Sequence, residues 1–211
     1  MKNAIDIKGV SKTYRDFTLD SLTLSLPEGS IMGLIGENGA GKSTTIKLIM
    51  NAILPDSGSI EVLGMDNKSP EFAEAKEDIG VVLDEATGGL DPIVRDEILD
   101  IFNDFTRDES HSVLISSHIV SDLEKICDYI AFLHRGRLMF VEEKDLLYEN
   151  YALVNMTKTQ LSGMPKGSVL GSRENSYGAE VLMLRSDIPA GMVPERITIE
   201  DIMLYMAREE R

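Results

Sequence analysis

The segment Gly36-Glu37-Asn38-Gly39-Ala40-Gly41-Lys42-Ser43-Thr44 constrains the fold of this chain more than any other stretch. It matches the phosphate-binding loop pattern, Gly-x4-Gly-Lys-Ser/Thr, at every fixed position. An apolar run precedes the loop at 31–35, and a run with helical character follows it at 45–50. This order predicts a strand, a loop and a helix, which is the context in which the motif binds a nucleoside triphosphate.

Each residue type in the loop has a chemical reason. Glycines let the backbone curl around a polyphosphate, so that backbone N–H groups and the positive end of the next helix face the negative oxygens. We expect Lys42 to reach the β- and γ-phosphates, Ser43 to complete the coordination of a magnesium ion, and Thr44 to assist at the α-phosphate. The predicted binding residues of the loop are Gly36, Asn38, Gly39, Ala40, Gly41, Lys42, Ser43 and Thr44.

The charge of the chain disfavours some partners. The chain has 211 residues, and its 21 basic and 36 acidic side chains give a net charge of −15. This charge opposes non-specific attraction to nucleic acid and to anionic lipid, so we expect no nucleic-acid partner and only local binding of polyphosphate. The length suggests one main domain with a small appendage.

The sequence predicts a cytoplasmic location. Its single cysteine, Cys127, lies in an apolar helical pattern, which is typical of a small buried side chain and excludes a disulfide scaffold. No apolar run approaches the ~18 residues of a membrane-spanning helix, and residues 1–6 lack the apolar region of a secretory signal. Any role at a membrane is therefore expected to come through a partner.

Strands and helices are expected along the rest of the nucleotide-binding region. The strand-like runs lie at 5–7, 22–26, 59–63, 79–83 and 112–117. The fourth of these runs is nearly all apolar, as in the buried centre of a parallel sheet. We expect an α/β fold of the P-loop type, with a mainly parallel sheet flanked by helices and an antiparallel portion formed by the N-terminal strands.

An acidic pair, Asp84-Glu85, ends the apolar run at 79–83. The pair suits the second nucleotide motif, in which the first carboxylate orients magnesium and the second handles the attacking water. Asp91-Pro92 then begins a helix, with the acid as its cap and proline at a tolerated first position. The apolar stripe of this helix is expected to pack in the core, and it consists of Ile98, Ile101, Phe102 and Phe105.

His118 ends the strand-like run at 112–117. Parallel sheets place ligand groups at this end of their strands, where an imidazole can contact the γ-phosphate or the attacking water. His111 and His134 have no comparable context in the sequence.

The ordered motifs resemble those of the ATP-binding cassette family, the ATPase subunits of ABC transporters. They are the phosphate loop, Leu-Asp-Glu-Ala-Thr at 83–87, Gly-Leu-Asp-Pro at 89–92 and Ser-Ser-His at 116–118, and the resemblance covers roughly residues 3–142. By position, the resemblance implies an adenine-stacking aromatic, a magnesium-orienting acid, a catalytic base, an acid in the loop that crosses the dimer, and a switch histidine. These are, in that order, Tyr14, Asp84, Glu85, Asp91 and His118.

The resemblance also implies cofactors and partners. Family members hydrolyse ATP between two ATPase subunits arranged head to tail. ATP and Mg2+ are therefore the implied cofactors, and a second ATPase subunit, identical or different, is one implied partner. A separate membrane permease is the other, and it would hold the chain at the inner face of the cell membrane.

The chain departs from the family between the phosphate loop and the acidic pair. The family has a glutamine-bearing loop, a helical subdomain and a Leu-Ser-Gly-Gly-Gln-like signature there, but only 42 positions separate Lys42 from Asp84. The sole glutamine, Gln160, comes too late in the sequence, and so does Leu161-Ser162-Gly163. We infer a missing helical subdomain with a junction near 83–85, either from a deletion or because the sequence closes over a missing stretch.

Residues 143–211 are expected to form an appendage to a nucleotide-binding core at 1–142. A hairpin is predicted around the turn 175–178, and Thr198 and Asp201 are expected to begin a final packing helix. Such a tail resembles those of bacterial exporter ATPases whose permease is a separate chain.

Three functions stay open at this point. The first is the ATP-binding subunit of a bacterial ABC exporter. The second is a regulatory or truncated module that binds nucleotide but is deficient in hydrolysis. The third is an ABC ATPase that acts outside transport, on ribosomes or DNA, which the acidic charge disfavours.

Overall fold

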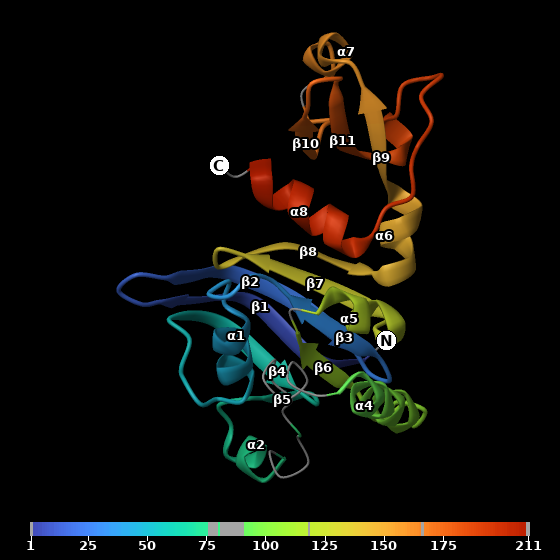
Figure 1. Cartoon of the computed structure of the whole chain (residues 1–211). Helices are drawn as coiled ribbons and strands as arrows, with labels where there is room; N and C mark the ends of the chain where they lie inside the picture. Colours follow the sequence, from blue (N-terminus) through green and yellow to red (C-terminus); the bar gives the residue numbers. More distant parts are fainter. Residues whose placement is uncertain (1, 76–79, 81–90, 118, 166, 210–211) are drawn as a thin grey trace. The chain divides into compact units, whose positions relative to one another are not determined.

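The structure is a computed structural model, and by its contacts the chain divides into two compact units, Met1–Glu142 and Glu143–Arg211 (Figure 1). Among the described residues, the first unit contains two four-stranded sheets, and the second contains one three-stranded sheet. The residues that the structure describes are 2–75, 80, 91–117, 119–165 and 167–209.

One sheet of the first unit is antiparallel and has the strand order β2-β1-β4-β5. Ile7 on β1 pairs with Leu24 on β2 and with Ile60 on β4, and all three side chains are buried. The three strands predicted in this region are confirmed. Their bounds, with that of a short fourth strand, are β1 (Asn3–Thr13), β2 (Thr18–Pro27), β4 (Ser57–Val62) and β5 (Met65–Asp66).

The second sheet has the order β6-β3-β7-β8, and β3 runs parallel to both of its neighbours. Every residue of β3 is buried because both faces of the sheet are covered. Met32 and Leu34 join the core shared with the antiparallel sheet, whereas a Cβ atom at Gly33 would lie 3.1 Å from Cys127 Sγ on the other face. The bounds are β3 (Ile31–Ile35), β6 (Val113–Ser116), β7 (Tyr129–His134) and β8 (Arg137–Glu143).

Two of these strands and the buried Cys127 were predicted and are confirmed. The strand predicted at 79–83 lies, apart from Gly80, outside the described residues.

The helices in the described part of this unit are α1 (Lys42–Ile49), α2 (Pro70–Ala75), α4 (Pro92–Phe105) and α5 (Val120–Ile126). Helix α1 packs beside β4, and its last carbonyls, those of Leu48 and Ile49, accept hydrogen bonds from the buried Asn67 side chain at 2.7 and 3.1 Å. Helix α5 packs on β3 through Leu123, which would meet any side chain at Gly33. Helix α5 therefore flanks the strand that leads into the phosphate loop, and α1 follows that loop in the sequence.

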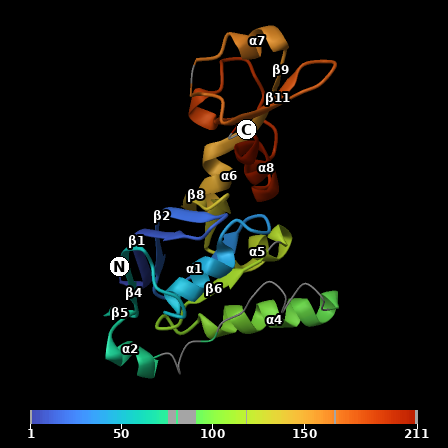
Figure 2. The same ribbon diagram turned by 90° about the vertical axis from the view of Figure 1, so that its left-hand side faces the viewer.

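The prediction that the apolar stripe of α4 lies in the core is wrong for Ile101 and Phe105, whereas Ile98 and Phe102 are half-buried. Ile101 is 62% exposed and Phe105 is 47% exposed, whereas Leu99 is buried. Helix α4 lies at the outer edge of its unit with α5 alongside (Figure 2). Because α5 covers one side of α4, only the side with Leu99 is buried, and Phe105 stacks instead on His111 with 4.2 Å between ring centroids.

The second unit has a three-stranded antiparallel sheet in the order β10-β11-β9. The predicted hairpin around 175–178 is confirmed as β10 and β11, whereas β9 carried no prediction. Helix α8 packs on β10 and β11 through the buried Ile199 and Ile202, as expected for a packing helix. The elements are α6 (Lys144–Asn150), β9 (Tyr151–Met156), α7 (Lys158–Ser162), β10 (Gly171–Glu174), β11 (Ala179–Leu184), the 3-10 turn η2 (Arg185–Asp187) and α8 (Ile199–Glu209).

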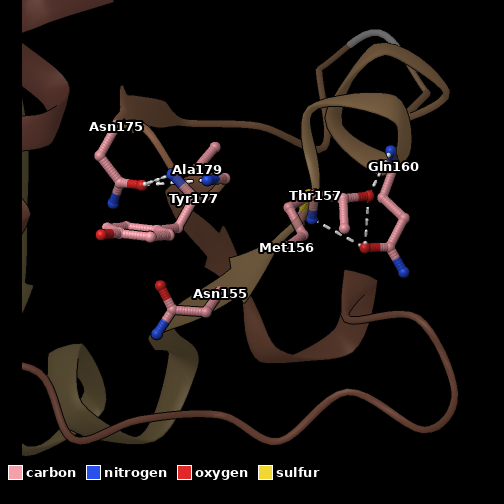
Figure 3. Close-up of a pocket in the computed structure, with 8 residues that line it drawn as sticks. Asn155, Met156, Thr157, Gln160, Asn175, Tyr177 and Ala179 are labelled. Carbon is pink, nitrogen blue, oxygen red and sulfur yellow. Dashed lines mark hydrogen bonds between the residues drawn. The ribbon is translucent and has the colours of Figure 1, made fainter.

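An open pocket of about 340 Å³ lies between the hairpin turn and the start of α7 (Figure 3). Three of its polar side chains have hydrogen-bond partners within the unit. Asn175 accepts from the backbone of Tyr177, Gln160 accepts from Thr157, and Asn155 donates to Glu195. The pocket therefore lies beside turns whose side chains already form hydrogen bonds within the unit.

Candidate functional site

The segment from Gly36 to Gly41 connects β3 to α1 and forms a loop against the end of β7. A Cβ atom at Gly36 would lie 2.3 Å from the carbonyl oxygen of Leu133, so only glycine fits between the loop and that strand. Gly41 has φ 115°, a conformation that favours glycine, and it precedes the first residue of α1. The two glycines thus let the backbone turn sharply from the strand into the helix.

The N-terminus of α1 has no side-chain cap and no acidic residue in its first turn. The first N–H groups of a helix lack partners inside the helix, and the helix dipole gives that end a partial positive charge. A phosphate bound there would serve both needs. The arrangement fits the predicted polyphosphate site.

Lys42 lies inside the loop and is 6% exposed. Its Nζ donates to the carbonyl oxygen of Gly36 at 2.6 Å and approaches that of Glu37 at 3.4 Å. The ammonium group is therefore held where the oxygens of a bound triphosphate could accept from it. Ser43 is exposed beside it and Thr44 is half-buried, so both hydroxyls follow directly on the loop.

The other wall of the loop comes from the turn between β7 and β8. The N–H of Gly136 donates to the carbonyl of Ala40 at 3.0 Å, and the carbonyl of Gly136 accepts from Asp20 on β2 at 2.8 Å. His134, at the end of β7, contacts Glu37 of the loop, with 2.7 Å between Nδ1 and Oε2.

Sequence reasoning missed this contact of His134. The available signal was its place directly after the buried run at 130–133, at the end of a strand in the parallel sheet.

Tyr14, the proposed adenine-stacking residue, is 43% exposed and follows β1. Its ring lies 6.4 Å from that of Phe17, and a Cβ atom at Gly41 would lie 3.0 Å from Phe17. Phe17 therefore bridges Tyr14 and the phosphate loop. Phe17 was not predicted as a site residue, although it comes three residues after Tyr14.

Asp56 forms hydrogen bonds with the two residues that precede Tyr14. Its carboxylate accepts from Lys12 Nζ at 2.8 Å and from the backbone N–H of Thr13 at 2.7 Å. The hydrogen bond from Lys12, and to a smaller extent that from Thr13, holds the pKa of this carboxyl below its usual value. This exposed network orients the segment that presents Tyr14.

Asp91 is confirmed as the cap of α4, since its side chain accepts from the backbone N–H of Ile93 at 2.9 Å. The other proposed catalytic and metal residues, Asp84, Glu85 and His118, lie outside the described residues. Among the residues that the structure does describe, no three His, Cys, Asp or Glu side chains gather into a metal cluster. Of the described residues, Ser43 is the proposed ligand for magnesium, together with phosphate oxygens.

A family model described as "ABC transporter" matches residues 19–163. That match covers more than half of the chain, and it includes the phosphate loop. The chain belongs to the ABC transporter family. ATP hydrolysis is general in this ATPase family.

Two relatives and one solved structure illustrate the similarity. An ABC transporter ATP-binding protein, YhcH of Bacillus subtilis, is 24% identical over 287 residues, which cover 97% of this chain and 91% of the relative. The bacitracin transport ATP-binding protein BcrA of Bacillus licheniformis is 24% identical over 212 residues, which cover 66% of this chain and 69% of the relative. The solved structure of cbiO1 from Clostridium perfringens, part of the ABC transporter complex cbiONQ, has a TM-score of 0.60 at 14% identity and covers 70% of this chain and 91% of that one.

The alignment with BcrA is longer than the matched part of this chain. It runs over 212 positions but covers 66% of 211 residues, so about a third of its positions are residues of the relative without a counterpart here. The alignment with YhcH shows the same imbalance.

Leu161-Ser162-Gly163 lies at the wrong end of a helix to act as the ABC signature. Helix α7 ends at Ser162, and Gly163 is its C-cap. The partial charge at that end of a helix is negative, which does not favour a phosphate. The geometry agrees with excluding this segment as a γ-phosphate site.

No helix in the described ranges has the length and apolar character that crossing a membrane requires.

Proposed function

We propose that this chain is the ATP-binding subunit of a bacterial ABC exporter, binding Mg-ATP at residues 36–44 and driving transport through a separate membrane permease. One observation carries the proposal. The N-terminus of α1 is left without a cap directly behind a loop that holds a buried ammonium group, that of Lys42. The family membership and the transport function named for BcrA support it.

The roles of the residues follow from their places. Backbone N–H groups of Asn38, Gly39 and Gly41 would surround the β-phosphate, and Lys42 would reach the β- and γ-phosphates. Ser43 would hold magnesium, which when bound neutralises and orients the phosphate oxygens, and Thr44 would contact the α-phosphate.

The remaining roles rest on position in the sequence. Tyr14 would stack on adenine beside Phe17. Asp84 would orient the metal, Glu85 would act as the base, and His118 would sense the γ-phosphate. Asp91 would belong to the loop that crosses a dimer of two ATPase subunits, near the inner face of the membrane.

We further propose that residues 1–142 form a nucleotide-binding core that lacks the helical subdomain of the family, with a junction near 83–85, and that 143–211 is the appendage. The unmatched third of the BcrA alignment supports a missing internal segment. A site without the signature helix has donors for the γ-phosphate on one side only, so hydrolysis should be slow. Sequencing the source gene across codons 75–95 tests this, and an intact insert there would refute it.

A second candidate function is a module that binds nucleotide without turnover. The place of Leu161-Ser162-Gly163 at the C-terminal end of α7 favours it, because no other signature-like segment is present in the sequence.

The deciding experiment measures Mg-ATP binding and steady-state ATPase rate on one sample, with Glu85→Gln as the matched control. Binding with turnover above that of the control supports the exporter ATPase. Binding with turnover equal to the control supports the silent module, and no binding refutes both.

A further inference from the structure

His134 and Glu37 join two segments that lie 97 positions apart in the sequence. Glu37 belongs to the phosphate loop, whereas His134 is the last residue of β7. Their contact, 2.7 Å between Nδ1 and Oε2, lies between a histidine side chain that is 7% exposed and a glutamate side chain that is 45% exposed. The imidazole is thus a fixed part of the fold, and the carboxylate is the member that can move.

The chemistry of the pair fixes the proton on Nδ1. A carboxylate only accepts hydrogen bonds, so Nδ1 must carry the hydrogen that it donates to Glu37. The other ring nitrogen, Nε2, is buried and has no hydrogen-bond partner among the described residues. The hydrogen bond to Glu37 is therefore the polar contact of the ring that the structure identifies.

The negative carboxylate of Glu37 is unfavourable in a loop that binds an anion. The backbone carbonyl oxygen of Glu37 lies 3.4 Å from Lys42 Nζ, so the residue forms part of the wall of the proposed triphosphate site. An unpaired carboxylate there would repel the triphosphate and compete with it for Lys42. The hydrogen bond from His134 holds the carboxylate toward β7 and away from that site.

We propose that His134 is a positioning residue for the phosphate loop, which acts on nucleotide affinity by restraining the carboxylate of Glu37. The inference rests on the proposed function, since it concerns the same nucleotide site. It adds a residue outside the loop motif, on a strand that sequence motifs do not mark.

The test uses variants that move or remove one hydrogen-bond donor. His134→Asn keeps an amide N–H near the place of Nδ1, whereas His134→Gln carries its amide one bond further, near the place of Nε2. His134→Leu fills the space without a donor. Glu37→Gln, alone and combined with His134→Leu, removes the negative charge.

The measurement is the Kd for a fluorescent ATP analogue with magnesium, with far-UV circular dichroism and thermal unfolding of each nucleotide-free variant as the check on folding. We expect His134→Leu and His134→Gln to bind roughly five- to tenfold more weakly, which is about the net value of one typical intramolecular hydrogen bond. The Kd of His134→Asn should stay within about twofold of that of the unaltered chain, because the Asn amide can keep this one hydrogen bond. Glu37→Gln should restore most of the affinity lost in His134→Leu, because no charge remains to restrain.

Rescue by both Asn at 134 and Gln at 37 supports the inference, and a purely structural role would not give the second rescue. Unchanged Kd values in all variants, or a loss in His134→Leu that Glu37→Gln does not recover, overturns it. If His134→Leu does not fold, the Asn and Gln variants at 134 decide, and equal Kd values for those two overturn it. No binding by the unaltered chain is a different result, since it refutes the proposed function and the inference together.

Discussion

Helices α1 and α8 begin in opposite ways. At the start of α8, the Thr198 hydroxyl accepts from the backbone N–H of Asp201 at 3.1 Å, and the Asp201 carboxylate accepts from the backbone N–H of Thr198 at 3.0 Å. At the start of α1, Gly41 offers no side chain at all. Side chains at the start of α8 therefore form hydrogen bonds with its first backbone N–H groups, whereas no side chain caps those of α1.

The other helices sharpen this contrast. Helix α4 has a cap from Asp91, and α7 has a complete capping box from Thr157 and Gln160. Helices α5 and α6 lack side-chain caps, but each has an acidic residue in its first turn, Asp122 and Asp145. Among these described helix starts, α1 alone combines the lack of a cap with the lack of an acid, which is the pattern expected where the ligand supplies the negative charge.

The largest expected effect comes from removing the positive charge of Lys42 at the uncapped start of α1. Lys42→Ala should weaken the binding of Mg-ATP by roughly 100-fold, which removes about 2.7 kcal/mol of ligand-induced stabilisation at saturating ligand. Lys47→Ala is the matched control, because Lys47 is exposed on the same helix. Thermal unfolding with and without Mg-ATP measures both, and an undiminished shift for Lys42→Ala would contradict the nucleotide site.

The next effect concerns the fit of the loop in front of α1. Gly36→Ala should destabilise the nucleotide-free protein by about 2 kcal/mol, because the new methyl group would overlap the carbonyl of Leu133. Gly39→Ala should cost about 1 kcal/mol, since its surroundings are open and only its backbone conformation is strained. Urea unfolding measures the difference, and equal losses would show that the loop is not packed against β7.

A smaller effect is expected at a helix that caps itself. Asp91→Ala should cost about 1 kcal/mol, because the N–H of Ile93 loses its acceptor. Asp91→Asn should keep nearly full stability, since asparagine caps as well as aspartate. Thermal unfolding without nucleotide distinguishes the two, and an Asn variant as unstable as the Ala variant would mean that charge rather than capping matters there.

The smallest effect belongs to the exposed network at Asp56. The folded-state pKa of this carboxyl is lowered, first by the Lys12 hydrogen bond, so its contribution to stability is present above the unfolded-state pKa and is lost as the pH falls through the folded-state value. Asp56→Asn should therefore lower the Tm slightly at pH 7, and the gap to the unaltered protein should shrink below about pH 4. A Tm difference that grows on acidification would contradict a stabilising role for the Asp56 carboxylate.

The strand, loop and helix around Lys42 could be predicted because local chemistry dictates them. The glycines, the lysine and the flanking apolar runs all lie within 31–50. The same holds for the caps of α4 and α8, where one side chain and an N–H two or three residues later suffice.

The parts that were missed depend on distant pairing. His134 gains its role only because β7 lies beside β3, and β9 forms only because β11 pairs with it. The stripe of α4 was misplaced for a related reason, since periodicity shows which face of a helix is apolar but not which face has a neighbour. Ile101 belongs to the apolar face and is nevertheless exposed.

The hydrogen bond from Gly136 to Ala40 has a consequence for how the protein is made. A nascent chain that has emerged only as far as β4 contains the complete loop motif, but β7 and the turn after it do not yet exist. At ~5–20 residues per second, the ribosome needs roughly 5–20 s to add the residues between the loop and that turn. During translation the motif therefore precedes its binding site by several seconds, and early nascent chains should not be retained on immobilised ATP.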